Sequence, residues 1–153
     1  MTTETFKSDT VAVDLSGFLP VDESTLEILA PDGRKTGWNI RLAGPSHPKT
    51  IALNDAAARK ELFRQKQIEQ AQVNGKKYKS EEKTPDDARR ETVQSIVGRI
   101  IGWNPINIGT GPIEFSEKAA EDLLIKPEMG WAYVQIAEAF GDEKRFTPRS
   151  GTK

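Results

Sequence analysis

Apolar and polar residues alternate along three stretches in the first third of the chain. The apolar members are Val11, Val13 and Leu15 in the first stretch, Leu26 and Ile28 in the second, and Trp38, Ile40 and Leu42 in the third. A period of two is typical of a strand with one buried face. The sequence Pro-Asp-Gly, which favours a turn, separates the second stretch from the third. We therefore predict a small antiparallel β-meander over residues 11–43.

The middle of the chain has a weaker helical pattern. We predict a helix over residues 49–72, with Asn54 as a possible cap and with Ala58, Leu62 and Phe63 on one apolar face. Beyond Phe63 the sequence is nearly all polar, and a polar loop or insert follows at residues 74–84. Such a sequence buries little apolar surface. The helix therefore either projects into solvent or gives way to partial disorder.

The second half of the chain predicts three helices. Thr84 and Ser116 are suitable caps for the first two, and Gly102 is a natural end for the first. Apolar residues recur with a period near 3.6 in each helix. They are Val93, Ile96, Val97, Ile100 and Ile101; then Ala119, Ala120, Leu123 and Leu124; and finally Met129, Tyr133, Ile136, Ala137 and Phe140.

A glycine-rich loop interrupts this helical half. Ile106 and Ile108 alternate before residues 109–111, and Ile113 and Phe115 alternate after them. A Walker-type phosphate loop needs a lysine and a Ser or Thr directly after its last glycine. Here a proline and an isoleucine follow instead. The pattern favours a short β-hairpin over a phosphate-binding loop.

These elements predict an α+β fold. A small N-terminal antiparallel β-meander precedes a mostly helical C-terminal part with a short β-hairpin. The expected organisation is a flexible tail at residues 1–10, a single domain at 11–141 (meander 11–43, helix 49–72, polar insert 74–84, helical part 85–141) and a flexible tail at 142–153.

Composition limits the kinds of binding partner and the cellular compartment that we expect for this protein. The chain has 22 basic and 23 acidic residues, a net charge of −1, so it offers no general basic surplus for nucleic acid. Residues 64–90 hold eight Lys/Arg against five Asp/Glu with Tyr78 as the only aromatic, which favours a solvated segment. The first residues lack the pattern of a secretory signal, and no apolar run approaches the ~20 residues of a membrane span. We expect a soluble protein that binds neither nucleic acid nor membrane.

Candidate catalytic chemistry is sparse. The chain has no cysteine, which excludes disulfides and thiol catalysis, and His47 is its one histidine. A hydrolase or transferase would have to combine His47 with a nearby carboxylate, and local capping by this loop histidine is the favoured alternative. The acidic pairs Glu81–Glu82 and Asp86–Asp87 lie in the most polar region, which favours a solvated face. We expect no enzyme activity, no cofactor and no metal site.

All three tryptophans follow a glycine, as Trp38, Trp103 and Trp131. A glycine allows a sharp turn or a close approach, and tryptophan adds a large apolar body with one polar N–H. They either anchor the core at the ends of elements or grip a partner, since aromatic residues are favoured in interfaces.

Taken together, the motifs resemble those of the tail assembly chaperones of long-tailed bacteriophages and prophages. The resemblance runs from Trp38 to Phe140, about two-thirds of the chain. The matching residues are Trp38, Gly44, His47, Pro48, Gly102, Trp103, Gly111, Pro112, Phe115, Ser116, Leu123, Leu124, Pro127, Trp131 and Phe140.

This resemblance implies a non-catalytic protein of the host cytoplasm. It would keep the tape measure protein soluble while major tail tube protein subunits assemble, and would be absent from the mature virion. Self-association and a longer frameshifted form are further implications. The predicted contact residues are Trp38, Trp103, Phe115, Trp131 and Phe140. A structural tail or head-tail component that stays in the virion is the alternative.

Overall fold

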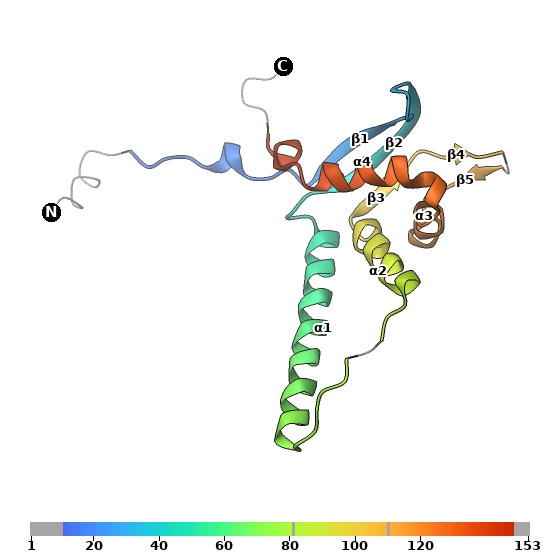
Figure 1. Cartoon of the computed structure of the whole chain (residues 1–153). Coiled ribbons are helices and arrows are strands. Elements are labelled where there is room, and N and C mark those ends of the chain that lie inside the picture. The colour runs from blue at the N-terminus through green and yellow to red at the C-terminus, as the bar shows by residue number, and fades with distance from the viewer. Residues whose placement is uncertain (1–10, 81, 110, 149–153) are drawn as a thin grey trace.

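A computed structural model describes residues 11–80, 82–109 and 111–148, and it has the predicted α+β architecture (Figure 1). A three-stranded antiparallel sheet has the order β1-β2-β3, and a separate two-stranded hairpin pairs β4 with β5. The strands are β1 (Glu23–Leu29), β2 (Lys35–Ala43), β3 (Ile100–Trp103), β4 (Ile106–Asn107) and β5 (Pro112–Ile113).

Four α-helices and three short 3-10 helices complete the described part. They are η2 (Ser16–Phe18), α1 (Pro48–Val73), α2 (Pro85–Val97), α3 (Glu117–Leu124), η3 (Pro127–Met129), α4 (Gly130–Phe140) and η4 (Glu143–Phe146). The caps predicted at Thr84 and Ser116 are confirmed, because each side chain accepts a hydrogen bond from a backbone N–H of its first helical turn.

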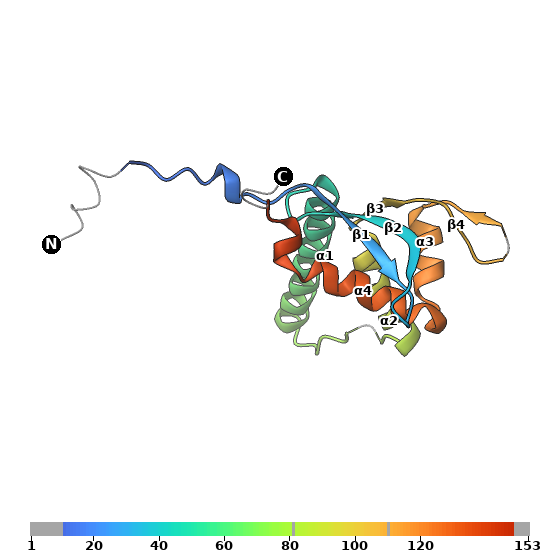
Figure 2. The ribbon, with the colours of Figure 1, turned by 90° about the horizontal axis from the view of Figure 1, so that it is seen from above.

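One apolar core lies between the sheet and helices α2, α3 and α4. In Figure 2 the sheet lies over α2 and α4, with α3 at its far end. The alternation in β1 and β2 places Ile28, Ile40 and Leu42 on the buried face, where they meet Ile136 of α4. The apolar strand faces, with a period of two, and the apolar helix faces, with a period near 3.6, therefore pack together in a single core.

The strand predicted at Val11, Val13 and Leu15 is wrong. These residues form no strand, and their side chains are 86%, 75% and 60% exposed. The third strand of the sheet is β3, which lies 57 positions after β2 and pairs Ile40 with Trp103 and Leu42 with Ile100. An alternating pattern identifies a strand with two unlike faces, but it does not identify the strand's partner.

The first C-terminal helix is also shorter than predicted. It ends at Val97 with Gly98 as its C-cap, and Ile100 and Ile101 belong to β3. Gly102 therefore lies inside a strand and does not end the helix. The Ile100 side chain is fully buried in the sheet, and the backbone N–H of Ala43 donates to the Arg99 oxygen. Pairing with the open edge of β2 outweighs the helical spacing of the two isoleucines.

Helix α1 projects from the rest of the molecule (Figure 1). Its 26 residues span roughly 39 Å, yet Thr50 is its only buried residue. The first of the two predicted alternatives, a helix that projects into solvent, is confirmed through Val73. The cap predicted at Asn54 is wrong: the helix begins at Pro48 and is capped by His47. The described residues of the 74–84 segment contain no helix or strand.

The predicted C-terminal tail starts too early. Residues 143–146 form η4, and Phe146 is buried in the core. The backbone N–H of Val21 donates to the Phe146 oxygen at 2.7 Å, which ties the chain before β1 to the chain after α4. The predicted tail at 1–10, and residues 149–153 of the C-terminal tail, lie outside the described residues.

Candidate partner-binding groove

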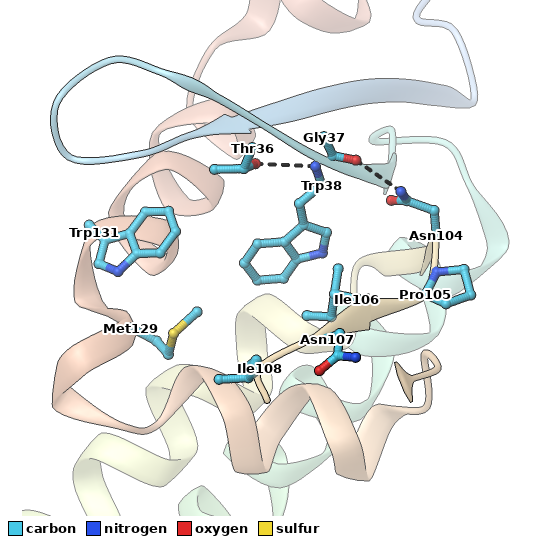
Figure 3. A pocket seen from close by; sticks show the side chains of 10 residues that line it. All are labelled: Thr36, Gly37, Trp38, Asn104, Pro105, Ile106, Asn107, Ile108, Met129 and Trp131. Carbon is cyan, nitrogen blue, oxygen red and sulfur yellow. Dashed lines mark hydrogen bonds between the residues drawn. The ribbon is translucent and has the colours of Figure 1, made fainter. Parts of the chain in front are cut away.

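A groove of about 420 Å³ lies between the start of β2, the chain around β4, and the start of α4 (Figure 3). It is lined by residues 36–38, residues 104–108, Met129 and Trp131. Two of the five predicted contact residues, Trp38 and Trp131, lie on facing sides of it. Cavities of this size accommodate small ligands or a few side chains of a partner.

The first wall of the groove is fixed by hydrogen bonds at the start of β2. The Thr36 hydroxyl donates to the Ile28 oxygen of β1 and accepts from the Trp38 backbone N–H at 3.1 Å. Gly37 has a positive φ of 80°, a conformation that side-chain-bearing residues rarely adopt. The Asn104 Nδ2 donates to the Gly37 oxygen at 2.9 Å, and the Asn39 backbone N–H donates to the Asn104 Oδ1 at 2.8 Å.

The floor rests on a series of aromatic rings. The Trp38 and Trp103 ring centroids are 5.3 Å apart at 80°, and those of Trp103 and Phe115 are 5.1 Å apart at 82°. Such edge-to-face pairs stabilise by about 0.5–1.5 kcal/mol beyond burial alone. Both buried indole nitrogens, Trp38 Nε1 and Trp103 Nε1, lack a hydrogen-bond partner among the described residues. The rings therefore act as apolar packing elements that hold Trp38 in place.

The opposite wall is held by Gln135 of α4. Its Nε2 donates to the Trp131 oxygen at 2.9 Å and to the Leu29 oxygen at 2.8 Å, and its Oε1 accepts from the Leu29 N–H at 2.9 Å. One amide thus joins the first turn of α4 to the end of β1. The Trp131 and Met129 side chains beside it remain half-buried and open to the groove.

The groove has the chemistry of an apolar binding site. None of its ten described lining residues carries a carboxylate, an amine or an imidazole. Tryptophan, methionine and isoleucine supply adaptable apolar contacts, and the Asn107 side chain and neighbouring backbone supply polar groups at the rim. Such a surface fits aliphatic or aromatic side chains of another polypeptide.

The other three predicted contact residues lie elsewhere. Trp103 is buried behind Trp38, and Phe115 is half-buried on the other side of Trp103. Phe140 lies at the far end of α4, where the Arg99 guanidinium stands 4.4 Å from its ring centroid. Burial lowers the pKa of Arg99, and its Nη2 donates to the Ala43 oxygen at 2.9 Å. The structure therefore separates Phe140 from the groove.

His47 has the local role favoured by the sequence. Its Nδ1 accepts from the Lys49 backbone N–H at 3.0 Å and so caps α1. Gly44, three residues earlier, lies so close to the Val21 backbone oxygen that a Cβ there would collide with it. In this Gly-x-x-His-Pro motif, Gly44 allows the close backbone approach, His47 caps α1, and Pro48 is the first residue of the helix.

The glycine loop joins β4 to β5, so no helix follows it and the phosphate-loop alternative is contradicted. Gly109 and Gly111 both have positive φ. No group of three or more acidic or histidine side chains that could hold a metal occurs within residues 11–80, 82–109 and 111–148. No helix in this part of the chain has the length and apolar character required to cross a bilayer.

No pattern in the sequence connects Asn104, Met129 and Gln135 with the site. Asn104 follows a Gly-Trp pair and precedes a proline, a pattern that indicates a turn without indicating what its amide binds. The spacing of Met129 indicates only a position on an apolar helix face. Comparisons with protein-family models, with curated proteins and with solved structures each give no match for this chain. The resemblance to tail assembly chaperones therefore stays a prediction based on the residues.

Proposed function

We propose that this protein is a phage tail assembly chaperone that binds the tape measure protein and keeps it soluble during tail assembly, without catalysis. The proposal combines the motif resemblance with one structural observation, which carries it. An uncharged groove presents Trp131 and Met129 beside a fixed Trp38. Major tail tube protein subunits would then displace the chaperone in the host cytoplasm.

The groove chemistry supports this function for a physical reason. A long helical client exposes apolar side chains that aggregate unless another surface covers them. Methionine and tryptophan cover such side chains without demanding one partner sequence, because their contacts are large and adaptable. The long polar helix α1 beside the core would add solubility to the complex.

The decisive experiment is coexpression with the tape measure protein that the proposal assigns to this chain as its partner. We expect a higher soluble yield of the tape measure protein and co-purification of the two chains. Trp131→Ala should weaken co-purification while the domain stays folded, because Trp131 packs against the core but is only half-buried. The matched control Leu62→Ala removes an exposed apolar side chain of α1 and should leave co-purification unchanged.

Two results would overturn the proposal. The first is a tape measure protein that is equally soluble alone and never associates with this chain. The second is stoichiometric presence of this protein in purified particles by mass spectrometry, which would favour a structural tail or head-tail component.

A further inference from the structure

The residues before β1 form an exposed apolar segment, which we call the apolar arm (residues 11–19). It extends away from the helices in both ribbon views (Figures 1 and 2). Phe18 and Leu19 are 68% and 59% exposed, in addition to the exposed residues 11, 13 and 15. Isolated apolar side chains are common on surfaces, but five exposed ones within nine residues favour an interaction site.

The second half of the arm has a defined conformation. The Asp14 Oδ1 accepts from the Ser16 N–H at 2.9 Å and from the Ser16 hydroxyl at 2.7 Å, and the Phe18 N–H donates to the Leu15 oxygen at 2.9 Å. In a 3-10 turn, residues three apart lie on the same side, so Leu15 and Phe18 point together. Leu19 follows with extended backbone and adds a third exposed apolar side chain next to this pair.

A second groove in the molecule suits such a peptide. It lies between α2, the end of α3 and the start of α4, and measures about 290 Å³; we call it the α2–α4 groove. Its apolar lining includes Val93, Leu124, Ile125 and Tyr133. Burial also raises the pKa of Tyr133, as expected for a hydroxyl beside an apolar surface.

Charge favours the same pairing. The charged residues among those that line the α2–α4 groove are Arg89 and Lys126, both basic, although Arg89 also pairs with Asp86 at 2.9 Å. Asp14 is the one charged residue of the apolar arm. The hydrogen bonds from Ser16 lower the pKa of Asp14, so this group is a carboxylate at neutral pH. The Asp14 carboxylate and the basic side chains beside the groove attract each other.

The arm cannot fill the groove of its own chain. The chain that follows the arm is fixed just beyond the C-terminal end of α4, because the Val21 N–H donates to the Phe146 oxygen of η4. The two residues of α4 that line the groove, Gly130 and Tyr133, lie about 15 and 10 Å from Phe140 along the helix. Leu19 and Phe18 lie within about 7 and 10 Å of Val21 even in a fully extended chain. These two residues therefore cannot extend along the groove of their own chain, whereas the groove of another molecule is open to them.

We propose that residues 14–19 of one copy dock into the α2–α4 groove of a second copy, with Leu15, Phe18 and Leu19 on its apolar lining and Asp14 beside Lys126. The contact is between unlike surfaces. Two copies can therefore exchange arms in a closed pair, or copies can continue as a chain. This association leaves the Trp38–Trp131 groove open to a different partner.

Sedimentation velocity of the full chain over a concentration series tests the proposal. We expect the sedimentation coefficient to rise with concentration, and Phe18→Ser to weaken association by about tenfold or more, as for a central apolar anchor. The control Leu62→Ser removes a similarly exposed side chain on α1 and should associate like the parent. A chain that stays monomeric up to about 100 µM, or a Phe18→Ser variant that associates normally, would overturn it.

A charge exchange gives an independent check on the position of the contact. Asp14→Lys and Lys126→Glu should each weaken association, and the double variant should recover much of the loss, because the pair is restored with its signs reversed. A photoreactive phenylalanine analogue at position 18 should cross-link residues 124–133 of an isotope-labelled second copy. Losses that simply add, or cross-links confined to one chain, would contradict the assignment.

Discussion

Helices α1 and α4 show that the length of a helix says little about its contribution to the fold. α1 has 26 residues and buries only Thr50, whereas α4 has 11 residues and buries Ala132, Ile136 and Ala139. Tertiary packing of an apolar face, and not propensity alone, supplies most helical stability in proteins. α4 therefore holds the core and borders both grooves, and α1 depends mainly on its own local contacts.

The largest difference should appear when one apolar side chain is shortened in each helix. Ile136→Ala leaves a cavity beside fully buried neighbours and should lower the free energy of unfolding by about 2–5 kcal/mol. Leu62→Ala on α1 should change it by less than about 0.5 kcal/mol. Urea denaturation followed by circular dichroism measures both. Equal losses would contradict the comparison.

Loss of a helix cap should have an intermediate effect in the packed region. The Thr84 hydroxyl accepts from the Asp87 N–H at 3.0 Å, and the Asp87 carboxylate accepts from the Thr84 N–H at 3.4 Å. Thr84→Ala should cost about 0.5–2 kcal/mol, because α2 packs in the core and its fraying weakens the whole domain. Ser95→Ala, inside the same helix and exposed, should be neutral or slightly stabilising in the same denaturation experiment.

Glycine substitutions sharpen the comparison further. Ala137→Gly in α4 and Ala58→Gly in α1 each lower helix propensity by about 1 kcal/mol. We expect the first to reduce global stability by about that amount. The second should mainly speed amide exchange within α1, because an exposed helix can open locally. Hydrogen exchange with mass spectrometry separates the two outcomes. A global loss of equal size in both variants would show that α1 and the core unfold as one unit.

The smallest effect concerns pH. Hydrogen bonds from Arg64 and Gln65 lower the pKa of Glu61 on α1 from 4.5 to about 2. Because the folded-state pKa is depressed, its contribution is present above pH 4.5 and is lost as the pH falls towards 2. The helical signal of α1 should weaken slightly over this range, and Glu61→Gln should remove that part of the pH dependence. A carboxyl pKa near 4.5, measured for Glu61 by NMR, would contradict the assignment.

Local signals in the sequence were sufficient for some of these features and insufficient for others. Thr84, Ser116 and the Pro-Asp-Gly turn act within a few residues of themselves, so their structures follow from sequence alone. Ile100 and Ile101 fit a helix and a strand equally well by spacing, and only the distant edge of β2 decides between them. Val11 and its neighbours alternate like a strand, but no strand in the described part pairs with them.

Some residues of the candidate site can likewise be recognised in the sequence, and others cannot. Trp38 and Trp131 stand out in the sequence because of their size and the preceding glycines, and both line the groove. Phe140 is also aromatic and ends a helix, yet it lies beside Arg99 and outside the groove. Met129 and Asn104 reach the groove only through the packing of α4 against β1 and of β3 against β2. Which apolar side chains face one another is a tertiary property that a period along the chain does not encode.

The hydrogen bond between Val21 and Phe146 has a consequence for engineering the molecule. It brings the entry and the exit of the folded core to one spot, so a short linker there can join them covalently. New termini then fit in the exposed segment after α1, where no regular backbone pairing would be cut. The resulting circular permutant would separate α1 from α2 in sequence while keeping every strand pairing of the sheet intact.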